Sequence, residues 1–507
     1  MAIRLANTEY GLVRGVPAGN NDITVFKSIP YAAAPTGNLR FCAPRKLKKW
    51  KGIYDACCFK PIAAQAEETH PFYSEEFYRY REKMSEDCLY LSIWTPAHEP
   101  DENLPVMMFI HGGGYQSGYH YEITIDGEAF AKQGVILVSV DYRLGALGFL
   151  AHKQLSEETG YGGSGNWGTL DQIAALKWIR RNIAAFGGNP EKITVFGQSA
   201  GALSVLNLIT SPLTSGDIAG AIMQSAGGYT SETTQVIPML NTEEAEKVGR
   251  DFLKILAVDS IAQARVLPWE SIVEAQKEFC RNGFMFAPVI DNYSQIMKPY
   301  EAVDAGKIPD IPYIVGINAD ENGENRYCRL QDQAAFLKEV HCRYGKVADD
   351  FLEECGFYDD PTTAIRQGGM NDLIQPPALA WCEKRLQSNS VYPTWLYYFS
   401  RELPGERPAG AYHSAELWYI FHTVHRSLRP LCGLDFDLSK AMNQYWCNFA
   451  KTGNPNGDSL TEWKPYRRCQ RMGMEFGDAI KMTEYPGSSR NRFVVNFIMN
   501  KWKESEK

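Results

Sequence analysis

The sequence lacks the features that mark several large classes of protein. No stretch of 18 apolar residues occurs, so no transmembrane helix is predicted. The 52 basic residues are outnumbered by 60 acidic ones, and the densest basic cluster, residues 45–49, is short and typical of a solvated surface. A nucleic-acid-binding protein would show a basic excess or a basic stripe. We therefore expect neither a membrane nor a nucleic acid as a partner.

Motifs that hold metals or nucleotides are absent as well. The sequence has no C-x-x-C, no H-E-x-x-H and no P-loop, so we expect no metal and no cofactor. Its 12 cysteines are scattered apart from the neighbours Cys57 and Cys58. The residues that follow Met1 contain no apolar signal-peptide core. Together these features predict a cytoplasmic protein with reduced thiols.

The pattern of apolar residues predicts an α/β fold. The chain has 507 residues, 44% of them hydrophobic, which allows a large core. Short apolar runs without polar alternation are typical of strands buried on both faces, as in a parallel sheet. These runs alternate with helical patterns. The predicted strands are 106–110, 135–140, 193–196 and 312–317, with a helix at 171–183 and helical excursions over the sheet at 230–310 and 325–450.

A pentapeptide with the pattern G-x-S-x-G follows the third predicted strand. It comprises residues 197–201 and precedes a helical stretch at 202–209. On such a strand-to-helix turn the serine has strained backbone geometry, so its neighbours must be small. The N-terminus of the following helix favours negative charge. Ser199 is therefore the candidate nucleophile, and the alternative is an ordinary glycine-bounded turn.

A run of three glycines, at residues 112–114, directly follows the first predicted strand. Glycines leave their N–H groups uncovered and readily adopt positive φ. Such donors, together with the N–H that follows a nucleophilic serine, can hold an oxyanion. A triple glycine alone is more often a flexible loop. On the same predicted sheet as Ser199, it predicts an oxyanion hole made by Gly113, Gly114 and Ala200.

A serine nucleophile needs a base, which in this kind of fold follows it in the chain. His341 lies in a helical pattern, where a solvated histidine is expected. His422 and His425 are spaced as on one helix. His413 lies between a glycine-containing loop and an aromatic segment. Because a base is expected on a loop at the end of a sheet, His413 is favoured.

The acid that orients the base is expected at a strand end between the serine and the histidine. Three carboxylates, Asp320, Glu321 and Glu324, follow the predicted strand 312–317. The residue pattern alone does not choose among them.

Several longer motifs are more specific than these short patterns. They include I-P-Y-A at 29–32, E-D-C-L-Y-L at 86–91, D-Y-R-L at 141–144, G-N-W-G at 165–168, F-G-G-N-P at 186–190 and N-F-A-K-T-G-N-P-N at 448–456. With the serine and glycine motifs, they make the chain resemble the type B carboxylesterase/lipase family of cholinesterase-like proteins over roughly residues 8–500. Within that family the chain looks most like the bacterial para-nitrobenzyl esterases.

The resemblance implies an α/β-hydrolase fold. Its central, mostly parallel sheet is flanked by helices, large helical excursions form the pocket, and a single domain covers residues 1–507. It also implies Ser199 as nucleophile, His413 as base, and Gly113, Gly114 and Ala200 as the oxyanion hole. Counting from Gly316, the acid of the family falls on Glu321. Ser225 matches a serine that often supports this acid.

The chain departs from the family pattern in two places. Asn322 stands where the family usually has glycine, with Gly323 one step later, which leaves the neighbours of Glu321 open as alternatives. Secreted members of the family pair the cysteine of E-D-C-L-Y-L with one shortly before an upstream glutamine, and here residues 63–65 read A-A-Q. We therefore expect Cys88 to stay reduced and the loop 67–85 to be more mobile, because the disulfide constraint is missing.

In the family this loop borders the active-site gorge. The hypothesis is a soft aromatic wall that accepts bulky acyl or aromatic esters, and the alternative is that the aromatic side chains only pack on the body of the protein. Phe284 and Phe286 similarly resemble positions in a pocket wall. The predicted substrate-pocket residues are Tyr115, Phe77, Tyr78, Phe284 and Phe286.

The predicted function is that of a serine carboxylesterase. It would hydrolyse small to medium carboxylic esters, aromatic ones included, with water through an acyl-enzyme, and its rate would rise with pH through the histidine titration at about pH 6–7. One alternative is a lipase or an amide or carbamate hydrolase of the same fold, although the loop 67–85 is too charged for the apolar lid of a lipase. The other is a non-catalytic cholinesterase-like scaffold, and such members typically lack a triad residue.

Overall fold

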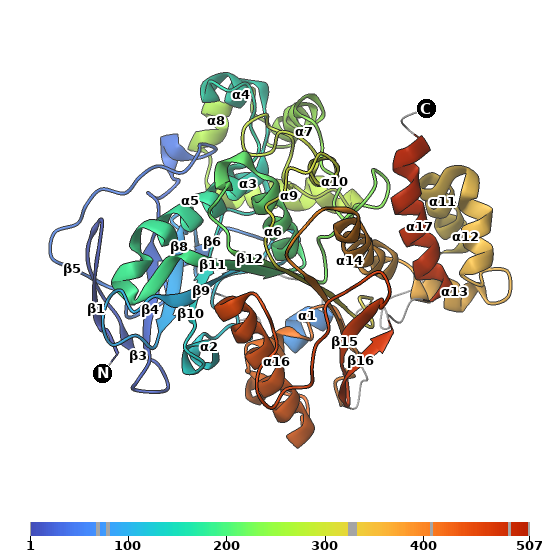
Figure 1. Cartoon of the computed structure of the whole chain (residues 1–507). Coiled ribbons are helices and arrows are strands. Elements are labelled where there is room, and N and C mark those ends of the chain that lie inside the picture. The colour runs from blue at the N-terminus through green and yellow to red at the C-terminus, as the bar shows by residue number, and fades with distance from the viewer. Residues whose placement is uncertain are drawn as a thin grey trace. The chain divides into compact units, whose positions relative to one another are not determined.

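The computed structural model describes residues 2–66, 71–77, 82–322, 332–405, 409–484 and 488–504 (Figure 1). They form two compact units. The first comprises Met1–Ala221, Met239–Ile311 and Trp446–Asn454, and the second comprises Ile222–Pro238, Pro312–Tyr445 and Pro455–Lys507. Each unit is described by itself, and the single domain expected over residues 1–507 stays a prediction.

The first unit contains six strands of the main sheet, in the order β11-β9-β10-β8-β4-β3. The strands β9, β10 and β11 run parallel, and the pairs β10–β8, β8–β4 and β4–β3 are antiparallel. All residues of β10 are buried, as expected for an apolar run covered on both faces. The bounds are β3 Val16–Pro17, β4 Thr24–Pro30, β8 Tyr90–Thr95, β9 Leu104–Ile110, β10 Ile136–Val140 and β11 Gly188–Gln198.

Two small sheets complete the strands of this unit. One has the order β1-β2-β5, and in the other β6 pairs with β7 in parallel. Their bounds are β1 Leu5–Thr8, β2 Gly11–Arg14, β5 Ile53–Asp55, β6 Ile62–Ala63 and β7 Met84–Ser85.

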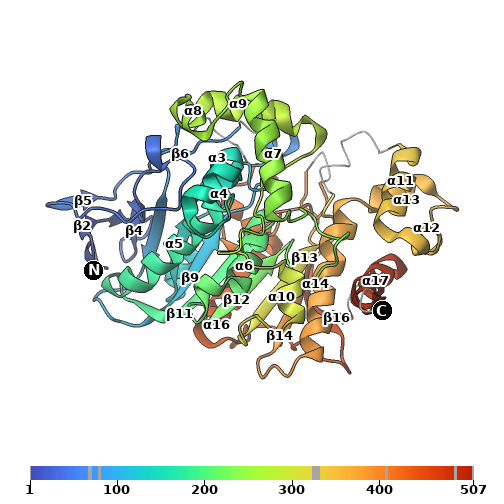
Figure 2. The ribbon, with the colours of Figure 1, turned by 90° about the horizontal axis from the view of Figure 1, so that it is seen from above.

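The helices of the first unit follow the predicted periodicity. The helix expected at 171–183 is observed as α5, Trp167–Asn182, in which Leu176 and Ile179 are buried while Arg181 is exposed. α7 (Thr242–Ile255) packs against α9 (Trp269–Phe279), as Figure 2 shows. The other helices are α1 Pro71–Glu76, α2 Glu128–Lys132, α3 Gly145–Phe149, α4 Lys153–Thr159, α6 Ala200–Thr210, α8 Ile261–Val266 and α10 Pro299–Asp304, with 3-10 turns at Gly37–Leu39, Ile183–Phe186, Pro212–Thr214 and Cys280–Asn282.

The second unit holds the later strands. The strand β12 (Gly220–Gln224) begins in the first unit and ends in the second. It is followed by β13 Tyr313–Asn318, β14 Thr394–Phe399, β15 Met472–Phe476 and β16 Ile480–Glu484, in the order β16-β15-β14-β13. The pairs β13–β14 and β14–β15 are parallel, and β15–β16 is antiparallel.

One expectation about this unit is wrong. β14 lies inside the segment 325–450, for which only helices were expected. Its sequence T-W-L-Y-Y-F is rich in the aromatic and β-branched residues that favour strands.

In the second unit, α17 (Ser489–Glu504) packs against α12 (Ala348–Glu354) and α14 (Met370–Gln387) (Figure 1). The remaining helices are α11 Gln333–Tyr344, α13 Pro361–Gln367 and α15 Leu417–Ile420, with 3-10 turns at Gly345–Val347 and Val424–Arg426, while α16, Gly433–Thr452, begins in this unit and ends in the first. Over the described ranges, no helix has the length and apolar character needed to cross a membrane.

Candidate active site

Ser199 lies on the turn between β11 and α6, and its backbone is strained. Its φ is 57° and its ψ is −128°, which costs a non-glycine residue about 1–3 kcal/mol. The turn needs the two flanking glycines, because a Cβ on Gly197 would lie 2.4 Å from the carbonyl oxygen of Gly201, and a Cβ on Gly201 would lie 2.0 Å from that of Ile110. The carbonyl of Ser199 accepts from the N–H of Ala202 at 2.8 Å, which joins the turn to the first turn of α6. The side chain of Ser199 is half-buried rather than buried.

The three-glycine loop packs directly on this turn. A Cβ on Gly112 would lie 2.7 Å from the carbonyl oxygen of Gln198 and 3.1 Å from the Cβ of Ser199. Gly113 and Gly114 have φ of 94° and 63°, which favours glycine at both positions. The carbonyl of Gly113 accepts from the N–H groups of residues 116 and 117, at 2.9 and 3.1 Å, and is thereby turned into its own loop. The structure therefore brings the predicted oxyanion loop and the predicted nucleophile together within the first unit.

His413 and Glu321 form a buried pair in the second unit. The distance from His413 Nδ1 to Glu321 Oε2 is 2.7 Å. Glu321 follows β13, and the other carboxylate oxygen, Oε1, accepts from the backbone N–H of Asn318 at 2.7 Å. The loop that carries His413 is joined to the same strand end, because the backbone N–H of Asp320 donates to the carbonyl of Ala411 at 3.1 Å. The Glu321 carboxylate thus fixes the orientation of the His413 ring through Nδ1.

The other carboxylates expected at this strand end have different placements. The backbone of Asp320 forms an isolated bridge with Tyr412, and Glu324 lies outside the described residues. Asn322, which replaces the glycine of the family pattern, donates through Nδ2 to the carbonyl of Gly368 and accepts at Oδ1 from the N–H of Met370 at 2.8 Å. The departure from the family pattern is therefore accommodated by a contact between this loop and the start of α14.

A second buried carboxylate, which the sequence reasoning missed, lies beside this pair. Glu416 is fully buried, and its Oε2 accepts from Asn318 Nδ2 at 2.7 Å. Burial, together with the negative charge of Glu321, raises the pKa of Glu416 to about 7. Asn318 therefore connects two carboxylates, through its backbone to Glu321 and through its side chain to Glu416. The sequence feature that could have indicated this carboxylate is its position, three residues after the candidate base His413.

The remaining predicted residues of the second unit are placed as follows. Ser225 is buried with φ 49°, its N–H donates to the carbonyl of Gly316 at 2.9 Å, and its Oγ has no partner among the described residues, so its support of the acid stays a prediction. His341 lies in α11 as expected. The expectation that His422 and His425 share a helix is wrong, because His422 lies in a turn with φ 55° and His425 in a 3-10 turn.

The predicted pocket residues of the first unit differ in exposure. Phe284 is half-buried and Phe286 is buried, and their rings meet edge to face with centroids 5.3 Å apart. Tyr115 is buried, with its ring 5.2 Å from that of Phe149. Phe77 is buried at the end of α1, and Tyr78 lies outside the described residues. The mobility of the loop 67–85 stays a prediction, since its residues 67–70 and 78–81 also lie outside them.

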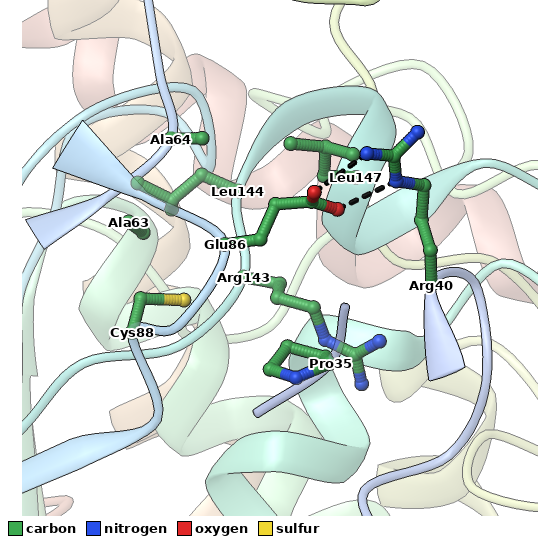
Figure 3. Close-up of a pocket in the computed structure, with 9 residues that line it drawn as sticks. All are labelled: Pro35, Arg40, Ala63, Ala64, Glu86, Cys88, Arg143, Leu144 and Leu147. Carbon is green, nitrogen blue, oxygen red and sulfur yellow. Dashed lines mark hydrogen bonds and ion pairs between the residues drawn. The ribbon is translucent and has the colours of Figure 1, made fainter. Parts of the chain in front are cut away.

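A separate pocket of the first unit surrounds Cys88 (Figure 3). Cys88 is buried and unbridged, and burial raises the pKa of its thiol well above the ordinary value. Two buried ion pairs involve residues that line this pocket: Arg40 with Glu86 at 2.5 Å, and Arg143 with Asp171 at 2.7 Å. Ser199 does not line this pocket, whose lining residues are Pro35, Arg40, Ala63, Ala64, Glu86, Cys88, Arg143, Leu144 and Leu147. In the part of the chain that the structure describes, no group of three or more metal-ligating side chains occurs.

The chain is similar to known proteins along nearly its whole length. The model of the Carboxylesterase family matches residues 3–367 and 369–494. The chain is 33% identical to a fumonisin B1 esterase of Sphingopyxis macrogoltabida, over 96% of this chain and 88% of that protein. It is 31% identical to a para-nitrobenzyl esterase of Bacillus subtilis, over 97% and 98%, and 33% identical to a human cocaine esterase, over 90% and 85%.

Solved structures show the same fold. A para-nitrobenzyl esterase superimposes with a TM-score of 0.82 at 28% identity, covering 97% of this chain and 99% of that one. The carboxylesterase EST55 of Geobacillus stearothermophilus superimposes with a TM-score of 0.82 at 30% identity, covering 97% and 100%. These matches confirm the predicted α/β-hydrolase fold. The chain therefore belongs to the carboxylesterase family and is a serine carboxylic ester hydrolase.

Proposed function

We propose that the chain hydrolyses small to medium carboxylic esters, aromatic ones included, through an acyl-enzyme on Ser199, with His413 as base and Glu321 as its orienting acid. The observation that carries the proposal is the strained backbone of Ser199, held by two glycines on a strand-to-helix turn. Strain of this kind is maintained where a nucleophile must be presented to a substrate.

In the first half of the reaction, Ser199 Oγ attacks the ester carbonyl while its proton passes to His413 Nε2. The negative charge that forms on the carbonyl oxygen is held by the N–H groups of Gly113, Gly114 and Ala200. Glu321 accepts from His413 Nδ1, which fixes the tautomer and stabilises the imidazolium. The tetrahedral intermediate then breaks its bond to the alcohol oxygen, and the alcohol leaves with the proton from His413.

In the second half, water attacks the acyl-enzyme and gives a proton to His413. The second tetrahedral intermediate expels Ser199 Oγ, which recovers the proton as the carboxylic acid is released. The proposal includes no metal and no cofactor, and its partners are an ester and water.

The contacts of the three-glycine loop support the proposal that aromatic esters are among the substrates. Gln116 Nε2 donates to the carbonyl of Phe286 at 2.6 Å and to that of Gly114 at 3.0 Å. An added Cβ on Gly114 would lie 3.5 Å from Met285 Sδ. The segment with Phe284 and Phe286 is therefore attached to the loop that would hold the substrate carbonyl. The name of the para-nitrobenzyl esterase relative specifies an ester with an aromatic part.

Covalent labelling tests the nucleophile. An organophosphate is expected to label one peptide, the one with Ser199, and Ser199→Ala is expected to abolish both the label and ester hydrolysis. Glu321→Gln is expected to lower kcat about 10⁴-fold at neutral pH, because the imidazole loses its orienting charge. For the wild type, kcat/KM is expected to rise with pH as the imidazole loses its proton. A protein without label or activity would instead be a non-catalytic scaffold.

A ladder of p-nitrophenyl esters of increasing acyl length tests the pocket. Phe286→Ala and Phe77→Ala are expected to shift the preference toward longer acyl groups, with the exposed Tyr358→Ala as the matched control. Tyr78→Ala extends the test to the segment outside the described residues. An unchanged chain-length preference in every variant would refute the role of these aromatic residues as a pocket wall.

A further inference from the structure

A second serine–histidine–carboxylate arrangement lies in the first unit, where the oxyanion loop ends. His120 Nδ1 is 2.6 Å from Asp141 Oδ2, and His120 Nε2 is 2.8 Å from Ser92 Oγ. The backbone N–H of His120 also donates to Asp141 Oδ1 at 2.7 Å. All three side chains are at most 1% exposed. We refer to Ser92, His120 and Asp141 as the buried relay.

The buried relay cannot be a second catalytic centre. Ser92 lies in the middle of β8, paired with Ser139 of β10, and so is not on a strand-to-helix turn. Its Oγ already accepts from the N–H of Ser28 at 2.9 Å. The rings of Phe59 and Tyr121 lie 5.9 and 5.0 Å from the imidazole. A substrate carbonyl therefore has no route to Ser92 Oγ, and the role of the relay must lie in what it holds.

The relay holds the far end of the oxyanion loop, residues 112–120. At the near end, Gly112 packs on the nucleophile turn, and at the far end Asp141 binds both the backbone and the ring of His120. Between them, Gln65 accepts from the N–H of Gly118 at 2.8 Å and donates to its carbonyl at 3.0 Å. A loop with three successive glycines has high conformational entropy, so fixed ends are needed to hold its N–H groups in one place.

A neutral imidazole satisfies all the hydrogen bonds of the relay. In this arrangement the N–H of Ser28 donates to Ser92 Oγ, and the hydroxyl of Ser92 donates to His120 Nε2. His120 then carries its proton on Nδ1 and donates it to the carboxylate of Asp141. Every polar atom of the imidazole is satisfied, and the buried carboxylate accepts two N–H groups of the same residue, which are charge-assisted bonds.

We propose that Ser92, His120 and Asp141 are positioning residues that set the oxyanion loop, so that the N–H groups of Gly113 and Gly114 point to where the transition-state charge forms. The inference rests on the proposed function, which assigns those N–H groups to the oxyanion. None of the three residues touches the substrate. Their removal therefore acts on kcat, through the placement of the loop, and leaves ground-state binding of the ester in place.

Two substitutions at Ser92 form a matched pair, since threonine and valine have nearly the same shape and differ by the hydroxyl. Ser92→Val is expected to lower kcat about 10-fold to 100-fold with KM within about twofold, whereas Ser92→Thr keeps kcat within a few-fold of wild type. Asp141→Asn is expected to have the larger effect, about 100-fold, because the amide cannot replace the carboxylate at both N–H groups.

The affinity of the active enzyme for a trifluoromethyl ketone is a measurement that would not change if the three residues only stabilised the fold. The ketone binds as an oxyanion adduct of the nucleophile, so its affinity for Ser92→Val and Asp141→Asn is expected to fall by the same factor as kcat/KM. Rates are normalised to active enzyme by organophosphate titration. Asp435→Asn, which breaks the ion pair of the buried Asp435 with Arg401 in the second unit, controls for loss of stability and is expected to keep the normalised kcat and the analogue affinity.

The outcomes separate the two proposals. The positioning role alone would be overturned if Ser92→Val is fully labelled by the organophosphate and keeps the wild-type kcat and analogue affinity. Equal losses in Ser92→Val and Ser92→Thr, or a change confined to KM, would overturn it as well. A wild-type enzyme that neither labels at Ser199 nor turns over esters would overturn the proposed function and this inference with it.

Discussion

Replacement of Glu416 by glutamine is expected to remove a large pH dependence of stability. Glu416 is buried beside Glu321, and both conditions favour its neutral form in the folded protein. Glutamine has the same shape, keeps the carbonyl oxygen that Asn318 Nδ2 binds in the native protein, and cannot ionise. The substitution therefore isolates the charge of Glu416 from its packing.

The magnitude follows from the difference between the two pKa values. The pKa of Glu416 is about 7 in the folded protein and 4.5 as its ordinary value. At 1.36 kcal/mol per pKa unit, the linkage is worth about 3 kcal/mol. The folded state binds the proton more tightly than the unfolded state, so the free energy of unfolding has its full value below pH 4.5. It then falls as the pH rises through 7 and changes no further above that.

Equilibrium denaturation by urea at a series of pH values from 4.5 to 8.5 measures this effect. The free energy of unfolding of Glu416→Gln, minus that of wild type, is expected to rise by about 3 kcal/mol from the lowest pH to the highest. Glu402→Gln removes an exposed carboxylate of the same unit and serves as the control, with a nearly flat difference. A flat difference for Glu416→Gln as well would refute the reasoning, because it would mean that the pKa of Glu416 is the same in the folded and the unfolded protein.

Three further predictions test other parts of the structure. Asp171→Asn leaves the buried Arg143 without its charge partner and is expected to cost about 3–5 kcal/mol of unfolding free energy. Asp55→Asn, in the exposed pair with Arg14, is expected to cost much less, and urea denaturation compares the two. Ala63→Cys or Ala64→Cys places a second thiol in the pocket that Cys88 lines. Under oxidising conditions a disulfide across about 25 residues is expected to raise the free energy of unfolding by about 3 kcal/mol. The measurements are a gain in Tm that a reductant reverses and the loss of two titratable thiols. Gly201→Ala is expected to cost about 1–3 kcal/mol, because its Cβ would meet the carbonyl of Ile110, whereas Gly134→Ala has only its positive φ to oppose it; equal losses would contradict the steric account of the nucleophile turn.

The local features of this protein were predictable from sequence because their causes are local. A serine flanked by small residues after an apolar run requires nothing distant to be identified, and the strained turn is found at that position. The same holds for the three-glycine loop and for the helix α5, whose buried face follows its own periodicity. The strand β14 was not predicted because its five consecutive apolar and aromatic residues, 395–399, give no period that separates a strand from a buried helix.

The contacts around the candidate base were decided only by the tertiary structure. The order of residues in the sequence left three carboxylates as candidates for the acid. The choice of Glu321 needed either the family pattern or the fold, which places Glu321 against His413 although they are 92 residues apart. Glu416 and Asn318 could not be assigned, because what matters there is burial and the distance between carboxylates. The buried relay is a stronger case, since Ser92, His120 and Asp141 come from separate segments of the first unit.

The sequence by itself determined the local backbone features of this enzyme: the positions of the glycines, the strained turn at Ser199 and the apolar strands. These depend on steric limits and periodicity that act over a few residues. The tertiary structure alone decided which buried polar groups share a proton or a charge. Such pairing depends on strand register and on burial, which set both the distance between two groups and the cost of leaving either one unpaired.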